Sequence, residues 1–392
     1  MNGIRLVPAI DHFETFGKFA EEYKLGKGDI LVTNRWMYQP LVEPLGLGLP
    51  VIFQEEFGEG EPSDEMMDAM KREMDKYEFS RIIAFGGGTI LDCCKVLSLK
   101  IPDKVADLYT GDVTPERITK LVLVPTTCGT GSEVTNVAVA ALPSFGIKKG
   151  IAHEQLYADQ AVLIPEALSG LPDGVFAASS IDALIHAAEA FVSPKASPYT
   201  DLLAREAIRM IMSGYMTIVG RGGNTRENRQ DLLSDFIIAA NYAGIAFGNA
   251  GVGAVHALSY AVGGAFHTSH GESNFICFTE VFRAYKEKSA QASENDSLKN
   301  REYILDPESN KLTALENMFA DILECEPANT FEALDQLLEN FIHKYPLREK
   351  GMTEDQIKSF AKSTIDNQQR LLANNYVPLS EKDIARIFAK LF

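Results

Sequence analysis

The chain has 392 residues, 46% of them hydrophobic and 23% charged, which is the composition of an ordinary globular protein. Its formal net charge of −17 disfavours nucleic acid and anionic membranes as partners, because proteins that bind them carry clustered Lys and Arg. The N-terminal stretch MNGIRLVPAIDHFETF has no basic segment leading into a long apolar run, and the five cysteines form no C-x-x-C pair. We therefore expect a cytoplasmic protein without a disulfide framework.

The first half of the chain alternates between short apolar runs and helical patterns. The predicted strands are residues 29–33, 50–53, 81–85 and 121–124. A helix with Ser63 as its N-cap is predicted for residues 63–77, and another follows Gly88. Strands that alternate with helices indicate a parallel, wound α/β sheet, which we assign to residues 1–176.

The second half, residues 177–392, is predicted to be helical. Long helical patterns cover residues 177–191, 199–219 and 228–249. Residues 237–266 contain no Asp, Glu, Lys or Arg, but six glycines and several polar residues interrupt the apolar run. We therefore predict a buried helical hairpin there and no membrane span. The polar stretch from Lys286 to Lys311 is expected to be a surface excursion.

Three consecutive glycines, Gly86 to Gly88, separate a predicted strand from a predicted helix in the stretch FGGGTILDCCK. Glycine lets a ligand approach the backbone closely, and a helix N-terminus offers free N–H groups and a positive dipole end. The pattern is not the G-x-G-x-x-G of a Rossmann loop. The strand, the three glycines and the helix together favour a pyrophosphate-binding loop, with a simple tight turn as the alternative.

A second polar loop, PTTCGTGSEVT at residues 125–135, also follows a predicted strand. Its threonines and serine supply hydroxyls, and its glycines supply open backbone. In an open α/β sheet, ligands bind beyond the carboxyl ends of the strands. Both loops are therefore expected to face one ligand, although such a stretch alone is often only a hydrophilic loop.

Asp182, His186 and Glu189 recur at i, i+4 and i+7 in the predicted helix SSIDALIHAAEAF. They form one polar stripe on an otherwise apolar helix, and buried polar groups need partners. A carboxylate and an imidazole one turn apart suit a divalent metal. The alternative is an Asp–His hydrogen bond on a partly exposed face.

Three more histidines lie in the stretch from Gly251 to Asn274. His256 is in the uncharged region, and His267 and His270 are three residues apart, which would place them on one face of a helix. With Asp182, the set of oxygen and nitrogen donors suits Fe(II), Zn(II) or a similar first-row metal.

Together these motifs resemble the iron-dependent (group III) alcohol dehydrogenases, over essentially the whole chain. The resemblance rests on GGG-x-x-x-D-x-x-K from Gly86, PTT-x-GT-x-SE-x-T from Pro125, D-x-x-x-H-x-x-E from Asp182, and His256 followed by His270-Gly271. It implies a dehydroquinate synthase-like fold, with an N-terminal dinucleotide-binding α/β domain and a C-terminal helical metal- and substrate-binding domain. We also expect a homo-oligomer, with a dimer favoured.

The resemblance also implies roles for individual residues. The implied ligands of a metal, Fe(II) or Zn(II), are Asp182, His186, His256 and His270. The implied NAD-binding residues are Asn34, Gly87, Gly88, Thr89, Asp92, Thr126, Thr127, Thr130 and Lys149. The implied reaction is hydride transfer between NAD(H) and a short-chain alcohol or aldehyde, with the metal polarising the substrate oxygen.

Within the family, the stretches SSIDALIHA, NYAGIAFGNAGVGAVHALSY and QQRLLANNY are similar to members that act on 4-hydroxybutyrate. The expected substrates are therefore 4-hydroxybutyrate and succinate semialdehyde. Arg370 is the expected partner of the substrate carboxylate, with a surface ion pair as the alternative. Another primary-alcohol or diol dehydrogenase, a dehydroquinate-synthase-like lyase, and a non-catalytic nucleotide- or metal-binding protein remain alternative functions.

The sequence departs from the family pattern at two positions. Many members have an Asp after the first strand that repels a 2′-phosphate, but here Asn34 is followed by Arg35, so NADP remains an alternative to NAD. Many members also have a histidine four residues after the third ligand, where this chain has Tyr260, so Tyr260 and His267 are the candidate catalytic residues. His267 could then supply a proton relay, since histidine is the side chain that most often transfers protons in catalysis, and a hydrogen-bonded cleft histidine is the alternative.

Overall fold

The computed structural model describes residues 3–58, 60–292 and 310–392. The chain forms two compact units: a sheet unit, Leu6–Leu171, and a helical unit, Pro172–Phe392 joined by the N-terminal residues up to Arg5. The helical unit begins just before helix α6 (Asp173–Val192), so the predicted boundary after residue 176 falls inside this helix.

The sheet unit is built on a parallel sheet, as predicted. Its strands run in the order β1-β8-β5-β4-β2-β3, and β6 and β7 form a separate antiparallel pair. The strands are β1 (Ala9–His12), β2 (Asp29–Thr33), β3 (Val51–Phe53), β4 (Arg81–Gly86), β5 (Lys120–Pro125), β6 (Val137–Leu142), β7 (Ile147–Ala152) and β8 (Gln160–Leu163). β2, β4 and β5 are almost wholly buried, because a parallel sheet with helices on both faces exposes neither side.

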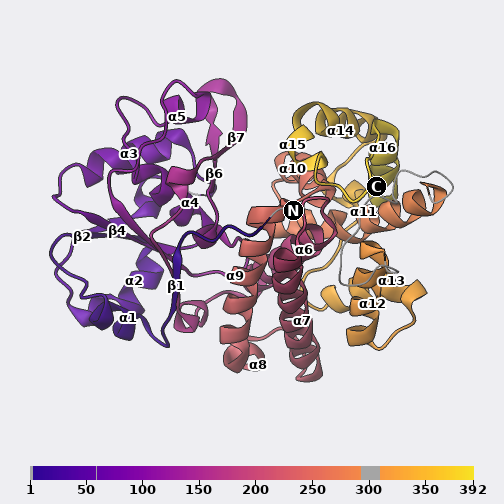
Figure 1. The fold of residues 1–392 in the computed structure, drawn as a ribbon, viewed down its shortest axis with the longest axis horizontal. Coiled ribbons are helices and arrows are strands. Elements are labelled where there is room, and N and C mark those ends of the chain that lie inside the picture. The colour runs from indigo at the N-terminus through magenta and orange to yellow at the C-terminus, as the bar shows by residue number, and fades with distance from the viewer. Residues whose placement is uncertain (1–2, 59, 293–309) are drawn as a thin grey trace. The chain divides into compact units, whose positions relative to one another are not determined.

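Helices cover both faces of this sheet, with α3, α4 and α5 on one side and α1 and α2 on the other (Figure 1). They are α1 (Phe16–Glu22), α2 (Arg35–Leu41), α3 (Asp64–Met74), α4 (Gly88–Leu97) and α5 (Ala106–Thr110). The Ser63 hydroxyl accepts a hydrogen bond from the Met66 N–H and caps α3, as predicted. Met66, Met70 and Met74 then recur at helical spacing and enter the core.

The helical unit contains α6 (Asp173–Val192), α7 (Pro198–Gly220), α8 (Arg226–Arg229), α9 (Leu233–Ala250), α10 (Ala254–Phe266), α11 (His270–Ala292), α12 (Lys311–Leu323), α13 (Thr330–Leu338), α14 (Glu354–Asn367), α15 (Gln369–Leu372) and α16 (Glu381–Leu391). Helices α6, α7 and α9 pack side by side (Figure 1), and α11 packs against α6, α10 and α16. The start of the predicted surface excursion, residues 286–290, is helical because α11 continues to Ala292, and its residues are exposed or half-buried. Residues 293–309 lie outside the described part of the chain.

Two apolar segments of the helical unit are long enough to cross a membrane by length and composition. Within the described residues these are α6, of which 83% of the apolar window is buried in the protein, and the segment from α8 to α10. The latter bends by 105° between α9 and α10, at the break after Ala250. The uncharged stretch is therefore a bent pair of helices packed inside the unit.

Candidate metal centre and nucleotide loops

The polar stripe of α6 lies inside the helical unit. Asp182, His186 and Glu189 are all at most 5% exposed, because α7, α9 and α11 pack around the helix. The alternative of a partly exposed face is therefore wrong. Three ionisable side chains in such a place need partners within the protein, since burying them unpaired is costly.

Asp182, His186 and His256 form one cluster. One ligand atom from each side chain lies within 4.8 Å of the other two. Asp182 Oδ1 is 3.6 Å from His256 Nε2, and Asp182 Oδ2 is 3.9 Å from His186 Nδ1. Two ligands about 2.1 Å from a tetrahedral ion lie roughly 3.4 Å apart, so these spacings fit a first-row metal better than direct hydrogen bonds.

Glu189 orients the His256 ring. Its Oε2 is 2.6 Å from His256 Nδ1, and its Oε1 accepts the Val255 N–H at 2.7 Å. With Nδ1–H donated to this carboxylate, Nε2 has the lone pair, which is the arrangement of a metal-ligating histidine. Nε2 is buried and has no hydrogen-bond partner among the described residues. The cluster therefore fits a divalent cation in the space that Nε2 faces.

The cluster stabilises positive charge. Burial by itself would raise the pKa of Asp182, but the nearby His186, His270 and His256 rings lower it below its usual value. Burial would lower the pKa of His256, but the Asp182 and Glu189 carboxylates raise it to about 9. The same two carboxylates would stabilise the positive charge of a metal ion at this place.

Stacking fixes the His186 ring. It lies parallel to the Phe247 ring, with the centroids 4.1 Å apart, and to the His256 ring at 4.6 Å. Phe247 comes from α9 and His256 from α10, so the ring is held between two neighbouring helices. The His186 Nδ1 atom is therefore already held near Asp182, so metal binding would not have to order this side chain further.

His270, the first residue of α11, lies at the rim of this cluster. Its Nε2 is 3.8 Å from Asp182 Oδ1, but its side chain is 38% exposed and it is not part of the tight group. Asn274, one turn later, donates to Asp182 Oδ1 at 2.7 Å and lies 3.2 Å from His270 Nε2. Asn274 was not among the predicted site residues, although its i+4 spacing from His270 would place it on the same helical face.

Close packing against α6 explains why a glycine, Gly271, follows His270. A Cβ atom at this position would lie 2.7 Å from the carbonyl carbon of Ala178 in α6, and closer still to its oxygen. The first turn of α11 therefore packs directly on the α6 backbone, one turn before Asp182. Only glycine allows this approach, and the approach brings His270 next to Asp182.

The two predicted catalytic side chains lie in different environments. His267 is the C-cap of α10, with φ of 53° and an exposed ring that makes no hydrogen bond to the described residues. The helix ends there and α11 begins at His270, so the expectation that both histidines share one helical face was wrong. Tyr260 lies one turn after His256, and its ring centroid is 6.3 Å from that of His270.

In the sheet unit, the two polar loops touch each other. β4 and β5 are parallel neighbours with Gly86 opposite Pro125, so their loops emerge at the same edge. A Cβ on Gly87 would lie 3.5 Å from the methyl group of Thr127, and one on Gly88 would lie 2.9 Å from that of Thr130. Helix α4 begins at this place, so its first N–H groups point out of the edge.

Asp92 and Lys95 of α4 hold these loops in place. Asp92 accepts the Ser132 hydroxyl at 2.6 Å and the Val139 N–H at 2.9 Å. The fully buried Lys95 ammonium donates to Ser132 at 2.6 Å and to Thr135 at 3.1 Å. Burial lowers the pKa of Lys95, and the Asp92 carboxylate opposes this shift. Both oxygens of Asp92 thus contact the protein itself, which indicates a positioning role.

The other predicted nucleotide-binding residues lie around this edge. Thr89 donates its hydroxyl to the Gly60 carbonyl at 3.0 Å, and the hydroxyl of Thr126 is buried without a hydrogen-bond partner among the described residues. Asn34 follows the last residue of β2 and is the N-cap of α2. Lys149 is exposed on β7.

Arg370 is exposed on α15 and makes no ion pair with any residue that the structure describes. The surface ion pair considered as its alternative is therefore absent there. The segment that follows is tied to the start of α10, because the Asn374 amide donates to the Val252 carbonyl at 2.9 Å. Arg370 is thus a guanidinium with no ion-pair partner in the described part of the chain, on the segment that supports the His256 helix.

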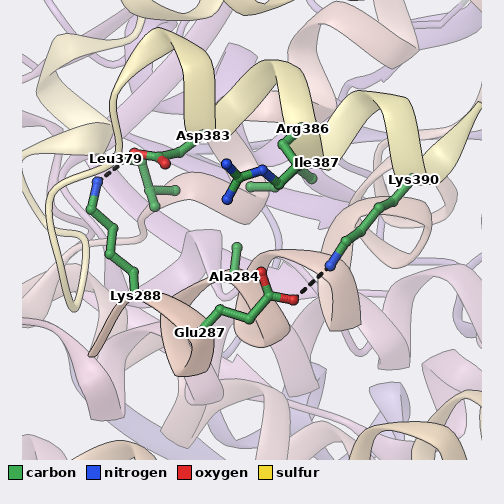
Figure 2. A pocket seen from close by; sticks show the side chains of 8 residues that line it. All are labelled: Ala284, Glu287, Lys288, Leu379, Asp383, Arg386, Ile387 and Lys390. Carbon is green, nitrogen blue, oxygen red and sulfur yellow. Dashed lines mark hydrogen bonds and ion pairs between the residues drawn. The ribbon is translucent and has the colours of Figure 1, made fainter. Parts of the chain in front are cut away.

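A surface pocket between α11 and α16 contains several charged side chains (Figure 2). Its cavity of about 20 Å³ has room for a single water molecule. Lys288 pairs with Asp383, and Lys390 Nζ lies 2.8 Å from Glu287. With two of its cations neutralised and so little volume, this pocket fits no organic substrate.

The wound parallel sheet with its two polar loops and the buried Asp182–His186–His256 cluster fit the class of metal-binding proteins that have a nucleotide-binding sheet unit. Residues 10–165 match the family described as Iron-containing alcohol dehydrogenase, and residues 176–392 match the Fe-containing alcohol dehydrogenase family, C-terminal. The chain belongs to the iron-containing alcohol dehydrogenase family.

Individual relatives agree with this assignment. The chain is 46% identical over 392 residues, and 100% of both chains, to 4-hydroxybutyrate dehydrogenase of Clostridium kluyveri. It is 36% identical to long-chain-alcohol dehydrogenase 1 of Geobacillus thermodenitrificans, over 80% of this chain and 75% of the relative. The structure of sulfoacetaldehyde reductase from Bifidobacterium kashiwanohense in complex with NAD+ is similar, with a TM-score of 0.80 and 20% identity over 100% of this chain and 98% of that one.

Proposed function

We propose that this chain is an NAD-dependent, metal-dependent dehydrogenase that interconverts 4-hydroxybutyrate and succinate semialdehyde. The observation that carries the proposal is the buried His256 Nε2, which has no hydrogen-bond partner among the described residues and faces Asp182 within the Asp182–His186–His256 cluster. The substrate follows from the relative that is 46% identical over the full length of both chains.

The side chains divide the work at the metal centre. Asp182, His186 and His256 would hold the ion, and His270 would complete the set from the rim. A bound Fe(II) or Zn(II) supplies a Lewis acid that polarises the substrate oxygen. Glu189 fixes the tautomer of His256, and Asn274 donates a hydrogen bond to Asp182 Oδ1, which orients this carboxylate. The family description favours iron, and the donor set also suits zinc.

The loops of the sheet unit supply the NAD site in this proposal. The N–H groups at Gly87, Gly88 and Thr89 would bind the pyrophosphate, because they start a helix and have no carbonyl partner within it. The Thr126, Thr127 and Thr130 hydroxyls would line the nicotinamide side. Asn34 and Lys149 would contact the ribose, and Asp92 would position the loops.

The direct test follows reduced-nicotinamide absorbance during reduction of succinate semialdehyde, with and without added Fe(II) or Zn(II). We expect turnover that depends on the metal and on the dinucleotide. Faster reduction of butanal than of succinate semialdehyde, or faster oxidation of 1,3-propanediol than of 4-hydroxybutyrate with NAD+, would identify another alcohol dehydrogenase of the family. No turnover with any short aldehyde would favour a lyase or a binding protein.

Arg370→Leu is expected to raise KM for succinate semialdehyde about 10- to 100-fold, because a charged hydrogen bond to the substrate carboxylate is lost. KM for butanal, which has no carboxylate, should change little. Arg386→Leu is the matched control, since Arg386 is likewise exposed and unpaired among the described residues. Equal effects of Arg370→Leu on both substrates would remove Arg370 from the substrate site.

We propose His267 or Tyr260 as the proton relay. His267→Asn is expected to lower turnover about a hundredfold if the imidazole transfers protons. Asn is the suitable replacement because it tolerates the left-handed backbone that Ala would strain. Tyr260→Phe tests the other candidate by removing only a hydroxyl. Metal content should stay unchanged in both variants, and full turnover of His267→Asn would assign the relay to Tyr260 or to neither.

A further inference from the structure

The end of β2 lies beside the position where the sheet changes direction. The chain passes from β2 to the edge strand β3, and then returns past β2 to add β4 on its other side. Nucleotides bind beyond the carboxyl ends of strands at such a switch point. Asn34 is the first residue after β2, and the end of β4 carries the glycine loop.

A carboxylate from the turn that follows β3, Gln54–Glu56, lies at this position. β2 and β3 are parallel with Thr33 opposite Phe53, so the residues after each strand meet at one edge. The Asn34 amide donates to Glu55 Oε2 at 2.8 Å, and the Arg35 N–H donates to Glu55 Oε1 at 2.7 Å. Glu55 therefore holds its negative charge directly beside Asn34.

The neighbouring cation is already paired. The Arg35 guanidinium forms an ion pair with Glu56 and lies over the Phe53 ring, 4.1 Å from its centroid. An arginine held in this way is less able to bind a phosphate than a free one. The local balance at the end of β2 is two carboxylates against one guanidinium.

We propose that Glu55 selects NAD over NADP in this chain, a proposal that rests on the proposed NAD-dependent function. A carboxylate has about four lone-pair sites, so Glu55 can still accept a ribose hydroxyl while it holds Asn34 and the Arg35 N–H. Its charge repels a 2′-phosphate. The acidic group that Asn34 does not supply thus comes from the turn after the adjacent strand β3.

The test measures dinucleotide binding without turnover. The affinities of the full-length protein for NADH and NADPH are obtained from the fluorescence of the reduced nicotinamide. In Glu55→Gln, the ratio of the NADPH Kd to the NADH Kd should fall at least about tenfold, because one charge near the phosphate is lost. Gln retains an oxygen for Asn34 or the Arg35 N–H, so the fold of the loop is conserved.

Glu78→Gln is the matched control, because Glu78 is exposed and precedes β4, which places it at the opposite edge of the parallel sheet. It removes the same charge and should leave the ratio unchanged. An unchanged ratio in Glu55→Gln would overturn the proposal, as would wild-type protein that prefers NADPH. If the ratio falls in Glu56→Gln but not in Glu55→Gln, the choice between NAD and NADP depends on the Arg35–Glu56 ion pair. That result would also overturn the proposed role of Glu55. Wild-type protein that binds neither dinucleotide would instead overturn the proposed function.

Discussion

His256→Ala is expected to lose its metal and at least about a thousandfold in turnover. The substitution removes a ligand and leaves the Glu189 carboxylate, now 2.6 Å from an empty position, buried without its ring partner. Breaking a buried charged pair in this way destabilises a protein by about 3–5 kcal/mol. Metal content per chain and the reduction of succinate semialdehyde measure the two effects. His343→Ala, which alters an exposed histidine of the same unit, should change neither.

The wild-type protein provides a second measurement if His256→Ala does not fold. A metal that binds only the folded state at 100 times its Kd stabilises it by about 2.7 kcal/mol, which raises Tm by several degrees. Chelation should therefore lower Tm, and added Fe(II) or Zn(II) should restore it. A Tm that changes neither on chelation nor on addition of metal would contradict the metal centre. Full metal content in His256→Ala would contradict it as well.

Gly271→Ala is expected to destabilise the helical unit by about 3 kcal/mol or more and to weaken metal binding. The new Cβ overlaps the Ala178 carbonyl group, which is backbone and cannot rotate away, so α11 has to move off α6. His270 and Asn274 would then leave Asp182. Thermal unfolding and metal affinity report the two consequences.

Gly264→Ala is the matched control for this prediction. Gly264 lies in the last turn of α10, and a Cβ there would meet no atom within 4 Å. Alanine is a better helix former than glycine, so this variant should be as stable as the wild type or about 0.5–1 kcal/mol more stable. A lower Tm for Gly271→Ala together with an unchanged or higher Tm for Gly264→Ala would demonstrate the close approach of α11 to α6. Equal changes would show that Gly271 has no special role.

Local sequence patterns predicted the strands and helices around the site, because the hydrophobic pattern of a strand and that of a helix repeat with different periods. β2 was predicted with the bounds Asp29–Thr33 that the structure shows. The i, i+4, i+7 stripe of Asp182, His186 and Glu189 placed three polar side chains on one helix face. The structure adds that this face is buried, which depends on α7, α9 and α11 and not on α6 itself.

The sequence by itself determined the parallel sheet, the two polar loops and the Asp182 stripe. The alternation of strand and helix patterns encodes the sheet, and the residues of single segments encode the loops and the stripe. Only the tertiary structure decided that Glu189 orients His256, that Gly271 lies on Ala178, and that Glu55 joins Asn34. These contacts connect segments far apart in the chain. Their physical cause is the packing of helices and the pairing of strands, which bring such residues within hydrogen-bonding distance without leaving a local pattern.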